Sequence, residues 1–384
     1  MDRRGASGLG ALLIALFVVP ACGTSSVARS SPPASSTAQF SPVASSGVTA
    51  PASTPASPSA TAPTDLRLVI FDPADSQVRL ARLDATDTAT TAGQFDGVVA
   101  GQAIVINGTG LLAMTAGGSV RTLGHLAAAP EYTGAGSVAV NPTLTQWVYT
   151  VWDTSGNSAV HLGSPSGDQV LATLPSPDGN AYYESFAWNA AGVYMVQEAT
   201  GLGGVGPFLE YHFPLGTLDL SSGKIALASP PCVADSVLDD GTLLCQNRTG
   251  GLEVRSPSGA THVIQLSTGT SAYEGVFSRL TLSPDQSRIV AARNGSSNPN
   301  LINYQMVVAD LSSSSSSAWG PADFYPDTWL PDGRLVADHL CWTFQQNGGP
   351  CDTSLDGTYI LSANGNTKTL FYKLVSGSVV GWVG

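Results

Sequence analysis

The sequence predicts an all-β fold, and three observations lead to that prediction. Beyond Asp65 the chain consists of short apolar runs with a period of two residues, separated by Gly, Pro, Asn and Asp, which is the pattern of strands and turns. No stretch of ten or more residues there has a helical period. The strands also recur as a unit at spacings of 34 to 50 residues. Because a strand-only repeat of this length is typical of propeller blades, we expect a single β-propeller.

The repeating unit is an apolar run, a tight turn and a second apolar run. Its six copies read AIVINGTGLLAM, SVAVNPTLTQWVYTV, FAWNAAGVYMVQ, DSVLDDGTLLCQ, LTLSPDQSRIVAAR and TWLPDGRLVADH. Their turns begin at Asn107, Asn141, Asn189, Asp239, Ser283 and Pro331, which gives spacings of 34, 48, 50, 44 and 48 residues. We expect each copy to form the first two strands of a blade.

A second hairpin follows these units and supplies the third and fourth strands. Its copies read SAVHLGSPSGDQVLATL, FLEYHFPLGTLDLSSGKIALAS, LEVRSPSGATHVIQL, MVVADLSSSSSSAW and TYILSANGNTKTLFY. Gly and Asn in several of these turns supply the positive φ that tight hairpins need. The serine run at residues 312–317 is expected to be a solvated hairpin tip.

The two ends of the repeat region complement each other. The chain finishes with SGSVVGWVG, a first-strand pattern with no partner after it, and the region begins with LRLVIFD and VRLARLD, which are later strands with no first strand before them. Pairing of these ends would complete a seventh blade and leave no free edge at the junction. We therefore expect seven four-stranded blades in a ring closed by the N- and C-terminal strands.

Two repeats carry a family resemblance. SPDQSRIVAAR and LPDGRLVADH resemble the SPDG-containing repeats of WD40-like, TolB-type propellers. The resemblance covers residues 66 to 384 as architecture, and its motif is degraded in the other four repeats. It implies a scaffold for protein partners in the bacterial cell envelope.

The first 21 residues are expected to be an export signal. Asp2, Arg3 and Arg4 precede an apolar stretch from Leu9 to Val19, which at 11 residues is too short to span a bilayer. The following VPAC resembles a bacterial lipobox. That resemblance implies lipidation of Cys22, membrane lipid as a partner, and a location on the periplasmic or extracellular side of a bacterial membrane.

Residues 22–64 are expected to be a disordered tether, and residues 65–384 the propeller domain. The tether is almost entirely Ser, Ala, Thr and Pro, so it has too little apolar surface to offset the entropy of ordering the backbone. As a coil it would span about 35 Å.

Charge and motif content exclude several classes of function. The formal net charge is −12, and an acidic surface repels phosphate backbones, so we expect no nucleic-acid partner. The sequence has no GxSxG, HExxH or EF-hand motif, and we expect neither a cofactor nor a metal. The scattered histidines are interpreted as structural; they are His125, His161, His212, His262 and His339.

Four cysteines remain after Cys22, which suggests disulfides in an exported chain. Three pairings are possible, and we favour the local one. Cys232 and Cys245 flank a hairpin turn, and Cys341 and Cys351 bracket another turn-rich connection. The alternative is a Cys₄ metal site, but neither pair has CxxC spacing.

Acidic residues and tyrosines recur just before the first strands of several blades, where a propeller forms one mouth of its central channel. Two of the acids, Asp235 and Asp327, stand four residues before the turns of their repeats. Such a mouth could receive a sugar, a cationic group or a peptide amine, or the same residues could simply pack between blades or solvate the rim. The candidate residues are Glu131, Tyr132, Tyr183, Glu184, Asp235, Tyr273, Glu274, Tyr325 and Asp327.

The leading hypothesis for function is a non-catalytic, membrane-tethered lipoprotein that binds an envelope protein or a small ligand at the propeller face. The alternative is a propeller enzyme of the lactonase, glycosidase or quinone-dependent dehydrogenase type, since fold alone does not fix function. A sensor module for envelope stress is a third hypothesis. Convergence of Glu184, Asp235, Glu274 and Asp327 within about 10 Å would favour an enzyme.

Overall fold

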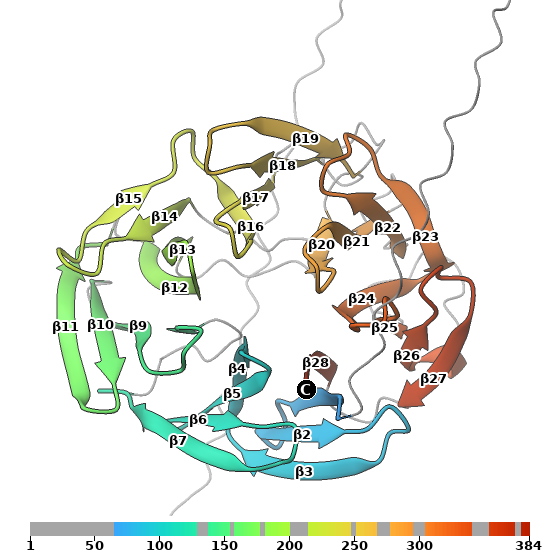
Figure 1. The fold of residues 1–384 in the computed structure, drawn as a ribbon, viewed down its shortest axis with the longest axis horizontal. Helices are drawn as coiled ribbons and strands as arrows, with labels where there is room; N and C mark the ends of the chain where they lie inside the picture. The colour runs from blue at the N-terminus through green and yellow to red at the C-terminus, as the bar shows by residue number, and fades with distance from the viewer. Residues whose placement is uncertain are drawn as a thin grey trace, which may run out of the picture. The chain divides into compact units, whose positions relative to one another are not determined.

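The computed structural model describes residues 65–128, 137–153, 157–176, 181–199, 214–246, 251–266, 277–294, 304–339, 353–372 and 378–384. These residues form β-strands and one short 3-10 helix, Thr353–Leu355. The strands make seven four-stranded antiparallel sheets arranged in a ring (Figure 1). The fold is therefore a seven-bladed β-propeller, as the sequence predicts. Among the residues in these ranges, no helix is long and apolar enough to cross a membrane.

The blades are numbered along the chain, and the strands of each blade are ordered from the central channel outward. Blade 1 is β28 (Ser378–Val383), β1 (Arg67–Asp72), β2 (Gln77–Ala81) and β3 (Asp87–Ala92); blade 2 is β4 (Gln94–Val99), β5 (Gln102–Asn107), β6 (Gly110–Met114) and β7 (Val120–His125); blade 3 is β8 (Val138–Val140), β9 (Trp147–Trp152), β10 (Ser158–Ser164) and β11 (Gly167–Leu174). Blade 4 is β12 (Ala181–Asn189), β13 (Gly192–Ala199), β14 (Leu215–Leu218) and β15 (Ile225–Leu227); blade 5 is β16 (Val233–Val237), β17 (Leu243–Gln246), β18 (Gly251–Arg255) and β19 (Thr261–Gln265). Blade 6 is β20 (Phe277–Leu282), β21 (Arg288–Asn294), β22 (Tyr304–Asp310) and β23 (Ser317–Ala322); blade 7 is β24 (Phe324–Trp329), β25 (Leu335–His339), β26 (Gly357–Leu361) and β27 (Lys368–Tyr372).

The ring closes in blade 1, where the last strand pairs with the first. Strand β28 lies antiparallel to β1, with Leu68 opposite Trp382 and Arg67 opposite Val383. The C-terminal strand thereby becomes the inner strand of a blade whose other three strands come from the start of the domain. The predicted closure is confirmed.

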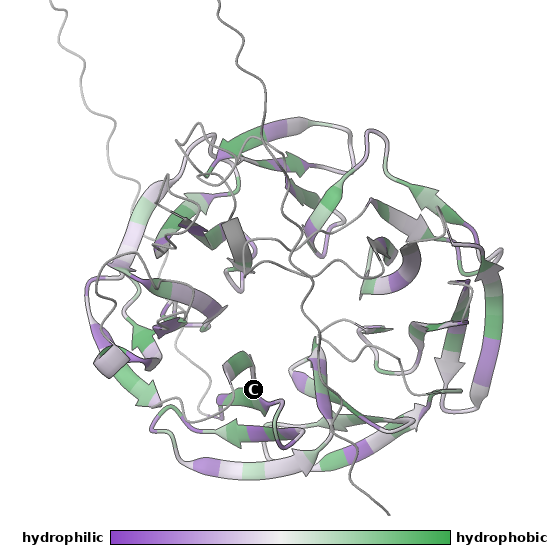
Figure 2. Cartoon of the chain, turned by 180° about the vertical axis from the view of Figure 1, so that it is seen from behind, coloured by the Kyte–Doolittle hydropathy of each residue, from purple (hydrophilic) through white to green (hydrophobic). Residues whose placement is uncertain are grey.

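The hydrophobic core lies between the blades rather than at the centre of the ring. Seven clusters of buried apolar side chains occupy the seven boundaries between neighbouring blades. At the boundary of blades 1 and 2, for example, Val69 and Leu80 pack with Phe95 and Val105. The outer strands are largely exposed, as β3 and β11 illustrate, and Figure 2 shows hydrophilic and hydrophobic residues interspersed along the strands of the ring.

One fully buried tryptophan illustrates how closely neighbouring blades approach. Trp147 of β9 packs between Gly163 of the adjacent strand β10 and Gly124 of β7 in blade 2. A Cβ atom at either glycine would overlap the indole ring. Both positions therefore require glycine for packing, since neither has a positive φ.

The first repeat differs from the prediction. AIVINGTGLLAM forms β5 and β6, the second and third strands of blade 2, rather than the first two. The inner strand β4 was missed because Asp96 and Gly97 interrupt its apolar pattern. Its turn is Ala100–Gly101, both at positive φ (49° and 70°), without the Asn or Asp that marks such turns in a sequence. From Ala100 the next turn start, Asn141, is 41 residues away (141 − 100), close to the spacing of the other repeats.

The turns from inner to second strand and from third to outer strand lie on one face of the ring, because strands alternate in direction. We call it the short-turn face, and every one of these turns lies within the described ranges. The domain also begins on the short-turn face, where Leu66 lies against Gly384.

Candidate functional site

Five of the nine predicted site residues lie within the described residues, and all five belong to inner strands. Tyr183 and Glu184 are in β12, Asp235 is in β16, and Tyr325 and Asp327 are in β24. The prediction placed most of them in the segments leading into these strands, and the structure places them within the strands themselves. The other four residues, Glu131, Tyr132, Tyr273 and Glu274, lie outside the described ranges.

Several inner strands carry a β-bulge, and in three of them the residue at the bulge is an aspartate. The register shifts between Phe95 and Gly97 in β4, between Ala234 and Ser236 in β16, and between Pro326 and Thr328 in β24. A bulge leaves one residue unopposed and turns its side chain to a new direction. The three residues so placed are Asp96, Asp235 and Asp327.

Asp96 is the site residue that sequence reasoning missed. It stands four residues before the turn at Ala100, as Asp235 stands four before Asp239 and Asp327 four before Pro331. The same rule would have found it if the first turn of blade 2 had been placed correctly. Counted in the same way from the turn starts, the position is a serine in blades 3 and 4, Ser137 and Ser185, and an arginine in blade 6, Arg279. In blade 4 the residue left unopposed by the bulge is Phe186, next to Ser185. We call Asp96, Ser137, Ser185, Asp235 and Asp327 the inner girdle.

Hydrogen bonds join girdle residues of neighbouring blades. Oδ1 of Asp96 accepts hydrogen bonds from the Ser137 hydroxyl (2.9 Å) and from the backbone N–H of Val138 (3.0 Å). The hydroxyl of Ser185 donates to the carbonyl oxygen of Ser137 (2.8 Å). Blades 2, 3 and 4 are therefore connected by hydrogen bonds between residues of the inner girdle.

The buried carboxyl group of Asp96 has an unusual proton affinity. Only 3% of the residue is exposed. Burial raises the pKa of Asp96 to about 7, because the ionised form loses its hydration, while the hydrogen bonds from Ser137 and Val138 act in the opposite direction. Near neutral pH, Asp96 is thus divided between its neutral and ionised forms.

The other two girdle carboxylates are less deeply buried. Asp235 and Asp327 are half-buried on blades 5 and 7. Nε2 of Gln246 in β17 lies 3.4 Å from Oδ1 of Asp235. Near Asp327, the indole N–H of Trp329 donates across the blade boundary to the carbonyl oxygen of Thr281 (3.2 Å). These contacts fix the inner strands on which the two carboxylates stand.

The two described tyrosines of the predicted mouth differ in exposure. Tyr325 is buried and forms part of the hydrophobic core. Tyr183 is half-buried; its hydroxyl accepts a hydrogen bond from Nε2 of Gln197 (3.0 Å), and its backbone N–H donates to the Ser158 hydroxyl of blade 3 (2.9 Å). Of the two, Tyr183 is the one with surface left for a ligand.

Three of the four acids whose convergence would favour an enzyme lie within the described residues, each on a different blade. Glu184, Asp235 and Asp327 stand on blades 4, 5 and 7, and Glu274 lies outside the described residues. Within the described part of the chain, no three His, Cys, Asp or Glu side chains are grouped so as to hold a metal ion.

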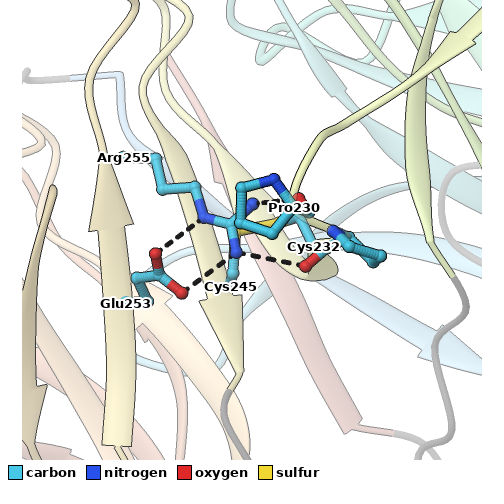
Figure 3. A network of polar contacts seen from close by, with 6 residues as sticks. Pro230, Cys232, Cys245, Glu253 and Arg255 are labelled. Atoms are coloured by element: carbon cyan, nitrogen blue, oxygen red, sulfur yellow. Dashed lines mark hydrogen bonds and ion pairs between the residues drawn. A yellow bond between two sulfur atoms is a disulfide. The ribbon is translucent and has the colours of Figure 1, made fainter. Parts of the chain in front are cut away.

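The segment entering β16 is held from two sides, and this positions Asp235. A disulfide joins Cys232, just before β16, to Cys245 of β17, which confirms the local pairing for these two cysteines. Cys341 and Cys351 lie outside the described residues. The guanidinium of Arg255 pairs with both carboxylate oxygens of Glu253 and donates to the carbonyl oxygens of Pro230 and Pro231 (Figure 3).

Comparison with known proteins gives similarity of fold only. No family model and no curated protein matches the sequence. Among solved structures, the chain is similar to TolB from Acinetobacter baumannii, with 16% identity, coverage of 84% of this chain and 68% of that one, and a TM-score of 0.39. It is also similar to the dihydro-heme d1 dehydrogenase NirN, with 10% identity, coverage of 86% and 77%, and a TM-score of 0.45. The β-propeller domain of the Trilobed protease from Pyrococcus furiosus has 7% identity, coverage of 80% and 92%, and a TM-score of 0.46. Identities this low say nothing about activity, and the assignment of this chain as a seven-bladed β-propeller rests on its own strand pairing.

Proposed function

We propose that this protein is a membrane-tethered lipoprotein of the bacterial cell envelope whose propeller is a non-catalytic binding platform. Its partner would be an envelope protein or small ligand that presents cationic groups to the inner strands. The observation that carries the proposal is the pair of half-buried carboxylates at the bulges of two inner strands, Asp235 and Asp327. Asp96 stands at the corresponding bulge of β4 but is buried, with only 3% of the residue exposed, so it does not meet a partner directly. Carboxylates repeated around a channel attract cations and disfavour anions.

The proposed attachment rests on the sequence before the propeller. The apolar stretch from Leu9 to Val19, the lipobox-like VPAC and the Ser/Thr/Pro/Ala-rich segment up to residue 64 are the parts that an exported, lipidated and tethered protein needs. One lipid-modified cysteine would then hold the chain at the membrane, and the tether would give the propeller its reach.

Attachment is tested by changing Cys22 to Ser in the full chain. We expect the variant to leave the membrane fraction, because a chain without lipid has no other anchor in this proposal. Immunoblotting of membrane and supernatant fractions measures the distribution. A variant that stays with the membrane would refute lipidation of Cys22 as the anchor.

Binding is tested by capture from intact membranes followed by mass spectrometry, with the double variant Asp235→Asn, Asp327→Asn beside the wild type. Replacing both carboxylates keeps side-chain size but removes two negative charges, so a cationic partner should be lost. Asp84→Asn is the matched control, because Asp84 is an exposed acid in a turn of blade 1. An identical set of captured proteins for all three chains would overturn the proposed site.

A further inference from the structure

A polar pocket lies on blade 3, away from the inner strands. It has a volume of about 300 Å³ and opens between the β8–β9 turn and the β10–β11 hairpin. Both connections belong to the short-turn face. The side chains that line it are Gln146, Leu162, Ser164, Ser166, Asp168 and Gln169.

The carboxylate of Asp168 is held in place by two rings behind it. Oδ2 accepts a hydrogen bond from the Tyr149 hydroxyl (2.6 Å), and Oδ1 lies 2.7 Å from Nδ1 of His161. The Tyr149 hydroxyl in turn accepts from the backbone N–H of Ala127, and the Tyr149 and His161 rings are stacked with centroids 4.8 Å apart. Burial raises the pKa of Tyr149, and the neighbouring Asp168 adds to that effect.

This support gives Asp168 a fixed orientation on a hairpin that otherwise faces solvent. The side chain of His161 is 9% exposed and that of Asp168 is 19% exposed, so the carboxylate sits at the border between the blade interior and the pocket. Three strands contribute: Tyr149 from β9, His161 from β10 and Asp168 from β11. A ligand group that meets a pre-oriented carboxylate binds without the entropy cost of ordering it.

The lining selects a class of ligand by its chemistry. Five of the six side chains are polar: two amides, two hydroxyls and one carboxylate. None of the six is cationic, so an anion would meet Asp168 without compensation, and the single Leu162 offers an apolar ligand too little surface. Neutral hydroxyl groups match best, because each can donate to the carboxylate and accept from an amide N–H. The volume is at the lower end of the range for small-molecule pockets, which suits one ring.

We propose that this pocket binds a neutral polyhydroxylated ligand, a single sugar residue, with Asp168, Gln146 and Gln169 as its hydrogen-bonding partners. The site is separate from the inner girdle and does not depend on the proposed function of the channel.

The test is saturation-transfer NMR on the full chain in detergent, with methyl β-glucoside and methyl N-acetyl-β-glucosaminide as probes and acetate as an anionic comparison. We expect transfer to at least one glycoside and none to acetate. The double variant Gln146→Ala, Gln169→Ala should weaken the signal at least tenfold, because it removes two partners without touching the Tyr149–His161–Asp168 contacts.

Gln77→Ala is the control, since Gln77 is a half-buried glutamine on blade 1 and its loss should leave the signal unchanged. Tyr149→Phe tests the support: it removes a hydrogen bond to Asp168 without altering the lining, and we expect weaker transfer from a folded protein. No transfer to either glycoside, transfer that survives in the Gln146/Gln169 variant, or a preference for acetate would each overturn the proposal.

Discussion

The Ser137 hydroxyl donates a hydrogen bond to the buried carboxyl group of Asp96 across the boundary between blades 2 and 3, at 2.9 Å. The two residues occupy equivalent positions, each four residues before the turn that follows its inner strand. Together with the bond from Ser185 to Ser137, this contact makes the inner strands of three blades one hydrogen-bonded unit.

Removing the Ser137 hydroxyl should destabilise the propeller. In Ser137→Ala, the buried Asp96 loses one of its hydrogen-bond donors, and an under-satisfied buried polar group costs about 1–3 kcal/mol. Urea denaturation measures the free energy of unfolding, and Ser258→Ala, in an exposed turn of blade 5, is the control. If Ser137→Ala and Ser258→Ala lost the same free energy of unfolding, the Ser137–Asp96 hydrogen bond would not contribute more to stability than an exposed turn residue does.

The raised pKa of Asp96 predicts a pH dependence of stability. Between the ordinary value of 3.8 and the folded value of about 7, the folded protein holds a proton on Asp96 that the unfolded chain has released. The contribution of this residue to the free energy of unfolding is therefore full below pH 4 and is lost as the pH rises to 7, by about 1.4 kcal/mol per pH unit.

Asp96→Asn isolates this contribution, because the amide does not titrate. Urea denaturation gives the free energy of unfolding of wild type and variant between pH 4.5 and 7.5. As the pH rises, the wild type should lose stability relative to Asp96→Asn. Two curves that stay parallel across this range would contradict the assignment of the proton to Asp96.

The packing of Trp147 between two blades leaves no room for a side chain at Gly124 or Gly163. Gly163→Ala and Gly124→Ala each place a methyl group on the indole ring, and overpacking of this kind costs about 1–3 kcal/mol. Gly97→Ala is a matched control in an inner strand, since nothing lies within 4 Å of its Cβ position. Thermal unfolding should rank both Trp147 neighbours below the control; an unchanged Tm at Gly163 would show that the ring can move aside.

The disulfide between Cys232 and Cys245 should contribute to stability while resisting reduction in the folded state. Both residues are buried, at 0% and 1% exposure, so a reductant should reach them only after unfolding. The double variant Cys232→Ala, Cys245→Ala should lose about 2–4 kcal/mol of unfolding free energy, as for other native disulfides. Treatment of the folded protein with a reductant and an alkylating agent together, followed by peptide mapping, checks protection: alkylated Cys232 or Cys245 in the folded protein would contradict it.

The sequence predicts the fold well because a propeller repeats one local pattern. The hairpins, the closing strands and the Cys232–Cys245 pair all follow from residues near each other in the chain or from the match between its ends. The inner girdle does not, because its bonds join residues 41 and 48 positions apart. Asp96 itself was hidden by the misplaced turn of blade 2.

The serine run shows a second limit of local reasoning. It does form the tip of the β22–β23 hairpin, but it is more than a solvated turn. The hydroxyl of Ser316 donates to the carbonyl oxygen of Gln265 in blade 5 (2.8 Å), and the Gln265 N–H donates to the carbonyl oxygen of Ser314 (3.1 Å). The composition of the serine run does not indicate its partner Gln265, which lies about 50 residues away in the chain.

The pairing of Leu68 with Trp382 sets the order in which the molecule can be finished. Six blades are each built from one continuous stretch of chain, so they can assemble as soon as their own residues have been made. Blade 1 has to wait for the last strand to be synthesised, and until then β1 presents an uncapped backbone to any neighbouring chain. Closure of the ring therefore requires the most non-local of the strand pairings in the described part of the chain, and pairings between residues so far apart in the sequence form slowly.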